Sequence, residues 1–304
     1  MTSYTIAILS NQNGLNSDKR IEGFKHKIGN ILSQLSMPVM LIAAMKKDVY
    51  RKPATAMWDL LYEKVGSSIQ LKDSYYVGDA AGRAEGWKPK ARKDHSCGDR
   101  KFADNIGIKF YTPEEFFLNQ EPIKFSWGPF IPKTYTSEAS LFSPADTPLI
   151  SEAQKPEVIV FVGSPAVGKS TFALKHLVSK GYEYVNQAIA CENAVREGKS
   201  VVIDNTNPDM ATRALYVKCA KAANARVRCF WFTAPVELAQ HNNAYRAYNA
   251  SAGGRELLSG IAFNLFKSKF QEPKLTEGFE EIRKINFVLD GTEEEKIKWQ
   301  RWWN

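Results

Sequence analysis

The residues from Gly163 to Thr171 read GSPAVGKST, which matches the phosphate-binding pattern GxxxxGK(S/T). The motif has the context that it requires, because an apolar strand pattern precedes it at residues 158–162 and a helical pattern follows at 169–179. In such a loop the backbone N–H groups and the helix N-terminus bind phosphates, the lysine contacts the terminal phosphates and the hydroxyl ligates Mg²⁺. We therefore predict that ATP and Mg²⁺ bind here, at Gly163, Ser164, Pro165, Ala166, Val167, Gly168, Lys169, Ser170 and Thr171.

Beyond this loop, the types and positions of Asp204 and Arg246 suit a site that transfers a phosphoryl group. Asp204 ends the apolar pattern VVID, where a carboxylate would hold Mg²⁺ through Ser170 and water. Arg246, in the string HNNAYR, would reach across the nucleotide and stabilise charge on the transferred group, the alternative being a solvated helix residue. Lys169, Asp204 and Arg246 are thus the predicted catalytic residues of a small kinase, since the NKxD motif of GTPases is absent from the sequence.

These side chains need parallel strands that end at one edge of a sheet. Strand patterns alternate with helical patterns in both halves of the chain. In the first half we predict strands at residues 4–9, 39–44 and 74–77, and helices at 20–35, 58–65 and 113–117. In the second half we predict strands at 158–162, 182–185, 200–203 and 227–232, and helices at 169–179, 189–197 and 211–223.

The predicted fold class is therefore α/β, with two doubly wound domains at residues 1–118 and 156–304. Between them, residues 119–155 lose the hydrophobic period and carry prolines at 122, 129, 132, 144 and 148, which is typical of a surface linker. The tail KIKWQRWWN is aromatic and basic. Bases can stack on tryptophan, but we favour a packed C-terminal cap for this segment.

Composition narrows the class of protein. The chain of 304 residues is 44% hydrophobic, which excludes a wholly disordered protein. It has no apolar run of roughly 18 residues, so we expect no membrane-spanning helix. Its four cysteines form no CxxC pair, so neither a disulfide framework nor a zinc site is indicated and a reducing compartment fits. The net charge of +8 favours a polyanionic partner, although charge alone leaves a basic enzyme with no nucleic-acid partner as an equal alternative.

Several strings in the second half resemble one known family. They are FVGSPAVGKSTF, KHLVSKGYEYVN, VVIDNTNPD, HNNAYR and FQEPKLTEGFEEI, and they are similar to the kinase domain of the eukaryotic polynucleotide kinase 3′-phosphatases. Strings in the first half, LSNQNG, YRKP, VGDAAGR and KDHSCGDRKFADNIGIKFYTPEEFF, resemble the phosphatase domain of that family, which has a haloacid dehalogenase fold. The resemblance implies a nuclear enzyme that phosphorylates 5′-hydroxyl DNA ends, removes 3′-phosphates and works with strand-break repair proteins.

The resemblance also implies roles for residues of the first half. Ser10 takes the place of the hydroxyl residue that binds the phosphate, Lys52 that of the lysine that neutralises the intermediate, and Asp79 that of a metal-holding carboxylate. Asp94 would be a second metal ligand and Arg83 would contact DNA. A phosphoaspartyl mechanism needs such a hydroxyl, cation and metal ligands around the phosphate.

The first departure from the family concerns the phosphatase nucleophile. The family carries a DxDGT signature at the end of a central first strand, whereas here only three residues precede the strand pattern at 4–9, and DGT recurs only in VLDGTEEEK. Without that strand its two neighbours would lack a partner for their backbone groups. We therefore expect the phosphatase half to be inert and poorly stable, unless the chain is a fragment of a longer one.

The second departure concerns the kinase general base. The family has an Asp after the strand written here as YEYVN, but this sequence continues NQAIACE. Glu192 and Asp209 are possible stand-ins, and we expect lowered 5′-kinase turnover. An alternative isoform, a faulty gene model and a degenerate protein all fit these two gaps. The competing functions are a DNA-end enzyme, a non-catalytic protein that binds ATP and DNA, and a small-molecule kinase, which the first-half strings disfavour.

Overall fold

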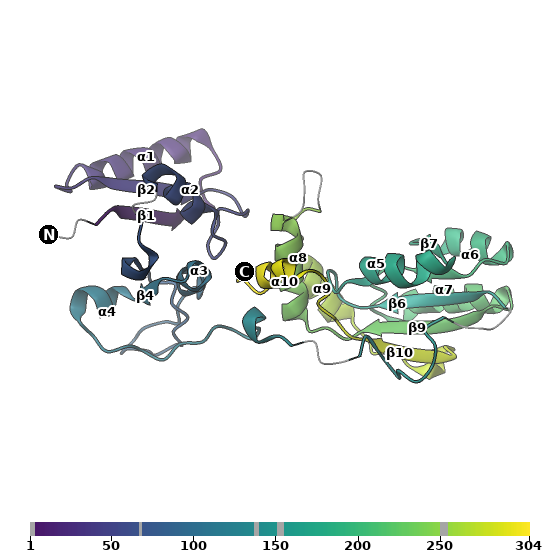
Figure 1. Ribbon diagram of the computed structural model, residues 1–304. Helices are drawn as coiled ribbons and strands as arrows, with labels where there is room; N and C mark the ends of the chain where they lie inside the picture. Colours follow the sequence, from purple (N-terminus) through teal and green to yellow (C-terminus); the bar gives the residue numbers. More distant parts are fainter. Residues whose placement is uncertain (1–3, 67–68, 137–139, 151–154, 250–254) are drawn as a thin grey trace. The chain divides into compact units, whose positions relative to one another are not determined.

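The computed structural model describes residues 4–66, 69–136, 140–150, 155–249 and 255–304 (Figure 1). It divides into two compact units. The first unit is Met1–Lys133 together with Lys298–Asn304, and the second unit is Thr134–Ile297. The predicted linker is therefore shared between the units, and the tail that was assigned to the second domain belongs to the first unit.

The first unit is built from short parallel strand pairs and four α-helices. Its strands are β1 (Ile6–Asn11), β2 (Val39–Ala44), β3 (Tyr75–Val77) and β4 (Lys109–Tyr111). Its helices are α1 (Asp18–Leu32), α2 (Ala56–Val65), the 3₁₀ turn η1 (Leu71–Asp73), α3 (Gly98–Ile106) and α4 (Pro113–Leu118), and η2 (Pro132–Thr134) lies at the boundary of the units. The sequence predicted all of these α-helices and strands except α3 and β4. A small core joins them, made of Leu9, Ala44, Met57 and Phe102.

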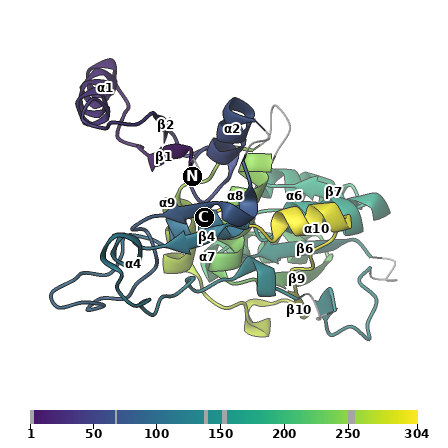
Figure 2. The ribbon, with the colours of Figure 1, turned by 60° about the vertical axis from the view of Figure 1, so that its left-hand side comes forward.

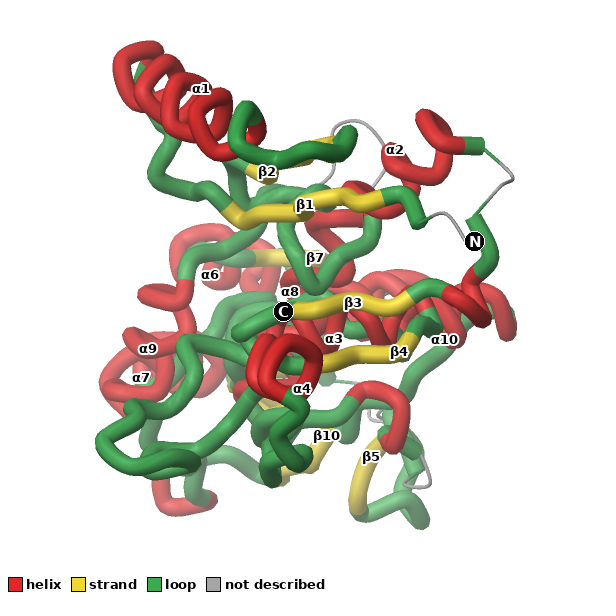
Figure 3. The backbone as a smooth tube through the Cα atoms, turned by 90° about the vertical axis from the view of Figure 1, so that its left-hand side faces the viewer, coloured by secondary structure: helices red, strands yellow, loops and turns green. Residues whose placement is uncertain are grey.

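Over the residues that the structure describes, the strands of the first unit form two separate sheets (Figure 3). β1 pairs with β2 and β3 pairs with β4, both in parallel. Side chains rather than a strand connect the pairs, because Lys52 Nζ donates to the Leu9 carbonyl oxygen at 2.7 Å and Tyr76 Oη donates to the same oxygen at 3.2 Å. On β1, Ile6 and Ile8 are 42% and 37% exposed. Among the described residues no strand connects β1 and β2 with β3 and β4, whereas the poor stability of the unit stays a prediction.

The C-terminal tail packs within the first unit. Trp302 donates from its indole N–H to Asp104 Oδ2 at 2.6 Å and stacks on Trp127 with ring centroids 5.2 Å apart. Its backbone exchanges two hydrogen bonds with the Asn105 side chain, at 2.8 Å each. The three tryptophans of the tail are buried, at 2% for Trp299, 2% for Trp302 and 9% for Trp303. The packed cap is confirmed, but its place in the chain's second domain is corrected.

The second unit contains a six-stranded sheet in the order β5-β10-β9-β6-β8-β7, and β6, β9 and β10 lie side by side in Figure 2. Its strands are β5 (Phe142–Ser143), β6 (Glu157–Val162), β7 (Glu183–Val185), β8 (Val201–Ile203), β9 (Arg226–Phe232) and β10 (Glu281–Ile285). Its helices are α5 (Lys169–Phe172), the π segment η3 (Ala173–Leu177), η4 (Val178–Lys180), α6 (Ala188–Arg196), α7 (Met210–Ala222), α8 (Val236–Asn249), α9 (Gly260–Lys269), η5 (Leu275–Glu277) and α10 (Glu293–Trp299), whose last two residues group with the first unit. All described strand pairs are parallel except β5 with β10.

Alternating residues of β6 build a core on each face of this sheet. Val158 and Val160 pack in one cluster with residues of α6 and α7, whereas Ile159 and Phe161 pack in another with residues of α5, α8 and α9. A strand that is buried on both faces reads as a continuous apolar run, which is why the sequence revealed it. The predicted doubly wound arrangement is confirmed for this unit.

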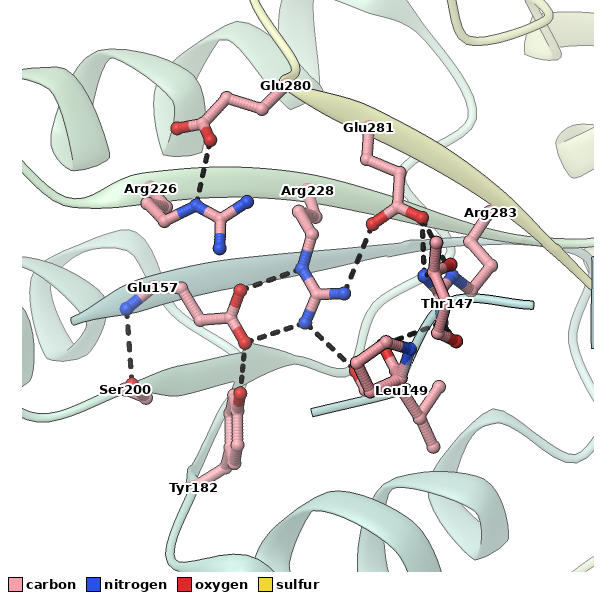
Figure 4. A network of polar contacts seen from close by, with 11 residues as sticks. Thr147, Leu149, Glu157, Tyr182, Ser200, Arg226, Arg228, Glu280, Glu281 and Arg283 are labelled. Atoms are coloured by element: carbon pink, nitrogen blue, oxygen red, sulfur yellow. Dashed lines mark hydrogen bonds and ion pairs between the residues drawn. The ribbon is translucent and has the colours of Figure 1, made fainter. Parts of the chain in front are cut away.

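A buried network of charges holds part of the predicted linker on the sheet (Figure 4). Arg228 forms a two-pronged ion pair with Glu157, both contacts at 2.7 Å, and Tyr182 also donates to Glu157. The same guanidinium donates to the Leu149 carbonyl oxygen at 3.0 Å, and Arg283 donates to the Thr147 carbonyl oxygen at 3.3 Å. Residues 141–150 are therefore a structural part of the second unit rather than a surface linker.

We expect the variant Arg228→Met to lower the free energy of unfolding of the second unit by about 3–5 kcal/mol, because Glu157 would stay buried without its cation. The side chains of Arg228 and Glu157 are only 2% and 1% exposed. Arg226→Met is the matched control, because its ion pair with Glu280 lies at the surface and is worth about 0–1 kcal/mol. Urea unfolding followed by circular dichroism measures both, and equal losses would contradict the prediction.

Candidate functional site

The predicted phosphate loop lies between β6 and α5, at the carboxyl end of a central strand. A Cβ atom on Gly163 would lie 2.8 Å from the Cβ atom of Phe232, so only glycine fits at the start of the loop. Gly168 adopts φ +94° and caps α5, a conformation that side chains other than glycine rarely tolerate. The sequence motif thus forms the turn that directs backbone N–H groups and a helix N-terminus to one point.

Lys169 lies under this loop, 8% exposed. Its Nζ donates to the carbonyl oxygens of Gly163 and Ser164, at 2.9 and 2.7 Å. Burial, assisted by the nearby charges of Arg246 and Arg255, lowers the pKa of Lys169 to about 8. An anion bound at the loop would place a negative charge beside the buried ammonium group of Lys169.

Asp204, at the end of β8, meets Ser170 as predicted. Ser170 Oγ donates to Asp204 Oδ2. The same oxygen accepts a hydrogen bond from the phenol of Tyr184, a residue of β7 that the sequence analysis did not single out. Burial raises the pKa of Tyr184, and this hydrogen bond raises it further. One oxygen of Asp204 therefore has two donors, and the other is free of hydrogen bonds among the described residues.

Arg246 approaches the phosphate loop from α8, the helix that follows β9. On this helix Asn242 Nδ2 donates to the carbonyl oxygen of Ala166 in the loop at 3.3 Å. Arg246 donates to Asn243 Oδ1 at 3.1 Å, whereas its Nε is buried without a partner in the described structure. Burial and the positive charge of Arg255 lower the pKa of Arg246. Lys169, Arg246 and Arg255 thus gather positive charge around one loop.

Ser164 Oγ is a second polar atom of this site that is buried without a described partner. A buried donor that lacks a hydrogen-bond partner lowers the stability of the fold by about 1–3 kcal/mol. Such a donor at a functional site is therefore expected to bind a ligand. Ser164 Oγ and Arg246 Nε can both donate to phosphate oxygens. Arg255, whose positive charge lowers the pKa of Lys169 and of Arg246, was not singled out in the sequence analysis.

The two stand-ins for the general base are both engaged elsewhere. Glu192 forms an exposed ion pair with Arg196 one turn along α6. Asp209 is the N-cap of α7, where it accepts from the Thr212 N–H at 2.7 Å and from the Thr212 hydroxyl at 2.8 Å. These hydrogen bonds lower the pKa of Asp209 and make it a poorer base. Neither residue is therefore supported as a replacement for the missing Asp.

In the first unit, the structure places Ser10 on β1 and two further predicted residues, Lys52 and Asp79, in loops that follow parallel strands. Ser10 lies near the end of β1 and its Oγ accepts from Gln12 at 2.9 Å. Lys52 is tied to the same strand end, because its backbone N–H donates to Asn11 Oδ1 at 3.0 Å. Asp79 follows β3, and its carboxylate is exposed.

Asp99 is the carboxylate that the structure brings to Lys52, and sequence reasoning missed it. Asp99 Oδ1 lies 2.7 Å from Lys52 Nζ, and Asp99 Oδ2 accepts from the Ala80 N–H at 3.1 Å. A Cβ atom on Gly78 would lie 2.5 Å from Asp99 Oδ2, so the glycine before Asp79 makes room for this side chain. The signal available in the sequence was only an acidic residue in the first turn of α3.

Asp94 and Arg83 form a buried ion pair with each other. Asp94 Oδ2 accepts from the Arg83 N–H and from Arg83 Nε, both at 2.9 Å. Arg83 also donates to Glu114 at 2.8 Å and stacks on Trp87 at 3.7 Å, with only 3% of its side chain exposed. The DNA contact of Arg83 is corrected, because a buried guanidinium with two carboxylate partners cannot reach a nucleic acid. The metal-ligand role of Asp94 stays a prediction.

Magnesium fits the residues around the phosphate loop. Ser170 and Asp204 offer a hydroxyl and a carboxylate oxygen, the hard ligands that Mg²⁺ prefers. The residues that the structure describes contain no group of three or more His, Cys, Asp and Glu side chains able to hold a metal. Within the described ranges, no helix is long and apolar enough to cross a membrane.

Comparison with known proteins identifies the family. A family described as polynucleotide kinase 3 phosphatase matches residues 1–117, and an AAA domain family matches residues 187–273. A bifunctional polynucleotide phosphatase/kinase of Schizosaccharomyces pombe is 39% identical over 295 residues, which cover 94% of this chain and 69% of that protein. The chain belongs to the bifunctional polynucleotide phosphatase/kinase family.

Other relatives agree with this assignment. A protein of Acanthamoeba polyphaga mimivirus, named as a putative bifunctional polynucleotide phosphatase/kinase, is 33% identical over 338 aligned positions, covering 98% of this chain and 79% of its own. The polynucleotide 3′-phosphatase ZDP of Arabidopsis thaliana is 34% identical over 132 positions, or 38% of this chain and 18% of that protein. These relatives confirm the resemblance that was inferred from the motifs in both halves of the chain. They also agree with the predicted α/β fold class of this chain.

Proposed function

We propose that this chain processes DNA ends by transferring the terminal phosphate of ATP to a 5′-hydroxyl. The observation that carries the proposal is the phosphate loop, in which Lys169 bonds to the loop carbonyl oxygens and Ser170 bonds to Asp204, together with the buried donors Ser164 Oγ and Arg246 Nε. Bound Mg²⁺ would neutralise charge on the phosphates. Lys169 and Arg246 would hold the transferred group, and Asp204 would orient Ser170 toward the metal.

We also propose that the protein acts in the nucleus among strand-break repair proteins, as the resemblance of its motifs implies. The net charge of the protein is +8, which favours binding to DNA because both duplex and single-stranded DNA are polyanions. The direct test is phosphate transfer from labelled ATP to a 5′-hydroxyl oligonucleotide in the presence of Mg²⁺. Transfer by the wild type but not by a Lys169→Ala variant supports the proposal, and transfer by both to the same extent refutes it.

We expect the affinity for an oligonucleotide to fall by at least tenfold between about 50 and 200 mM salt, because contacts to the phosphate backbone release counterions. The sequence contains no base-reading motif, so contacts of this kind should dominate. Fluorescence anisotropy at several salt concentrations measures the slope. A dissociation constant that does not change with salt would contradict the prediction.

A non-catalytic protein that binds ATP and DNA is the second candidate, and one observation favours it. Within the described structure, Glu192 and Asp209 are both engaged with neighbouring residues. The resemblance implies an Asp after the strand that ends at Asn186, and this sequence continues there with Gln187 and Ala188. Binding of ATP and oligonucleotide with no phosphate transfer would favour this candidate. Loss of the 3′-phosphatase activity in these 304 residues likewise stays a prediction, based on the missing DxDGT signature.

A further inference from the structure

Tyr184 occupies an unusual place in the second unit. It lies on β7, one of the two edge strands of the described sheet, and it is 41% exposed although its hydroxyl bonds to Asp204 at the centre of the candidate site. Its neighbour along the strand, Val185, is 4% exposed and packs in the core. An exposed aromatic ring that is fixed at its hydroxyl end offers a flat face at the mouth of the site.

The strand order separates the two sides of the phosphate loop. Starting from β6, which carries the loop, β8 and then β7 lie on one side, whereas β9 and the following helix α8 lie on the other. Arg246 and Asn242 approach from the α8 side. Tyr184 approaches from the β7 side, through Asp204. The transferred phosphate would therefore lie between the arginine on one side and the tyrosine on the other.

A second contact fixes the chain directly after Tyr184. Asn205 Nδ2 donates to the carbonyl oxygen of Asn186 at 2.7 Å and to the hydroxyl of Tyr216 at 3.2 Å. Asn205 follows Asp204, so the end of β7 and the end of β8 are held together on both sides of the carboxylate. This leaves the ring of Tyr184 little freedom to leave the site.

We propose that Tyr184 forms the acceptor-side wall of the kinase site, where its ring stacks on the terminal base of a single-stranded 5′-hydroxyl end and its hydroxyl positions Asp204. The inference rests on the proposed function and deepens it by naming where the acceptor binds. Stacking suits an enzyme that accepts any sequence, because every base has a π face. The hydroxyl role makes Tyr184 a positioning residue, which acts on the metal ligand and not on the reacting atoms.

The two roles separate in two variants. Tyr184→Phe keeps the ring and loses the hydroxyl, so we expect unchanged affinity for a 5′-hydroxyl oligonucleotide and a several-fold higher Mg²⁺ concentration at half-maximal turnover. Tyr184→Ala loses both, and we expect its affinity for the oligonucleotide to fall about 5- to 100-fold. Affinity is measured by fluorescence anisotropy without metal or ATP, so this readout does not depend on catalysis. Leu215→Ala, which removes a 57% exposed side chain from α7, is the control for a general surface effect.

An oligonucleotide whose 5′-terminal nucleotide lacks its base makes the test specific. Wild type and Tyr184→Ala should bind this abasic strand equally, because the stacking partner is gone from the nucleic acid. A loss of affinity by Tyr184→Ala that persists with the abasic strand, or no loss with the normal strand, would overturn the stacking role. An unchanged Mg²⁺ requirement in Tyr184→Phe would overturn the positioning role. No oligonucleotide binding by the wild type would instead refute the proposed function itself.

Discussion

Replacing Lys169 by alanine is expected to weaken ATP binding by about 30- to 4,000-fold, which isothermal titration calorimetry would measure directly. The ammonium group is buried beneath the phosphate loop and has carbonyl oxygens as its described partners. Removing one member of a buried, hydrogen-bonded charge pair costs about 2–5 kcal/mol, and each 1.4 kcal/mol corresponds to a factor of ten. The rest of the loop would remain, because its backbone turn depends on Gly163 and Gly168.

Lys175→Ala is the matched control for this experiment. Lys175 lies on the same helical segment, but its side chain is 55% exposed and its ion pair with Asp290 lies at the surface. We expect ATP affinity within about twofold of the wild type, because exposed ion pairs contribute little. Equal ATP affinity in the wild type and Lys169→Ala would refute the assignment of the phosphate site.

The second large effect is expected from restoring an Asp to the segment after β7. Inserting an Asp-containing segment between Asn186 and Ala188 should raise 5′-kinase turnover by about 10²- to 10⁴-fold, the usual contribution of a general base. The chain already keeps Lys169, Asp204 and Arg246, so positioning and charge stabilisation would be in place for the added base. Transfer of labelled phosphate from ATP to a 5′-hydroxyl oligonucleotide measures the gain.

An insertion of the same length that carries Asn in place of the Asp separates the base from the length of the segment. If this insertion restores turnover as well as the Asp version does, then positioning and not proton acceptance was lacking. If the unmodified chain already turns over within tenfold of the restored one, the interpretation of the missing base is wrong.

The sequence predicted those parts of the site that depend on local spacing. The phosphate loop, its strand and its helix are contiguous, so their pattern was sufficient to place Lys169 and Ser170. Asp204 was found because it directly follows a buried strand. Tyr184 could not be found, because a tyrosine on an edge strand gives no signal until the neighbouring strand brings Asp204 to its hydroxyl.

The corrections share one cause, which is that the partners of a charged side chain are remote in sequence. Arg83 was assigned to DNA from its motif, but Glu114, its second carboxylate partner, lies 31 residues further on. The predicted linker was assigned from its prolines and lost period, whereas β5 has only two residues and its partner β10 is near the other end of the chain. A two-residue strand leaves no periodic pattern to detect.

The packing of residues 298–304 in the first unit has a consequence for folding during synthesis. The ribosome completes residues 1–133 early, yet the partners of Asn105, Asp104 and Trp127 emerge only after the whole second unit has been made. The second unit is one uninterrupted stretch of chain and can close as soon as residue 297 is free. We therefore expect the first unit to gain the packing of Trp302 only after the second unit has been synthesised.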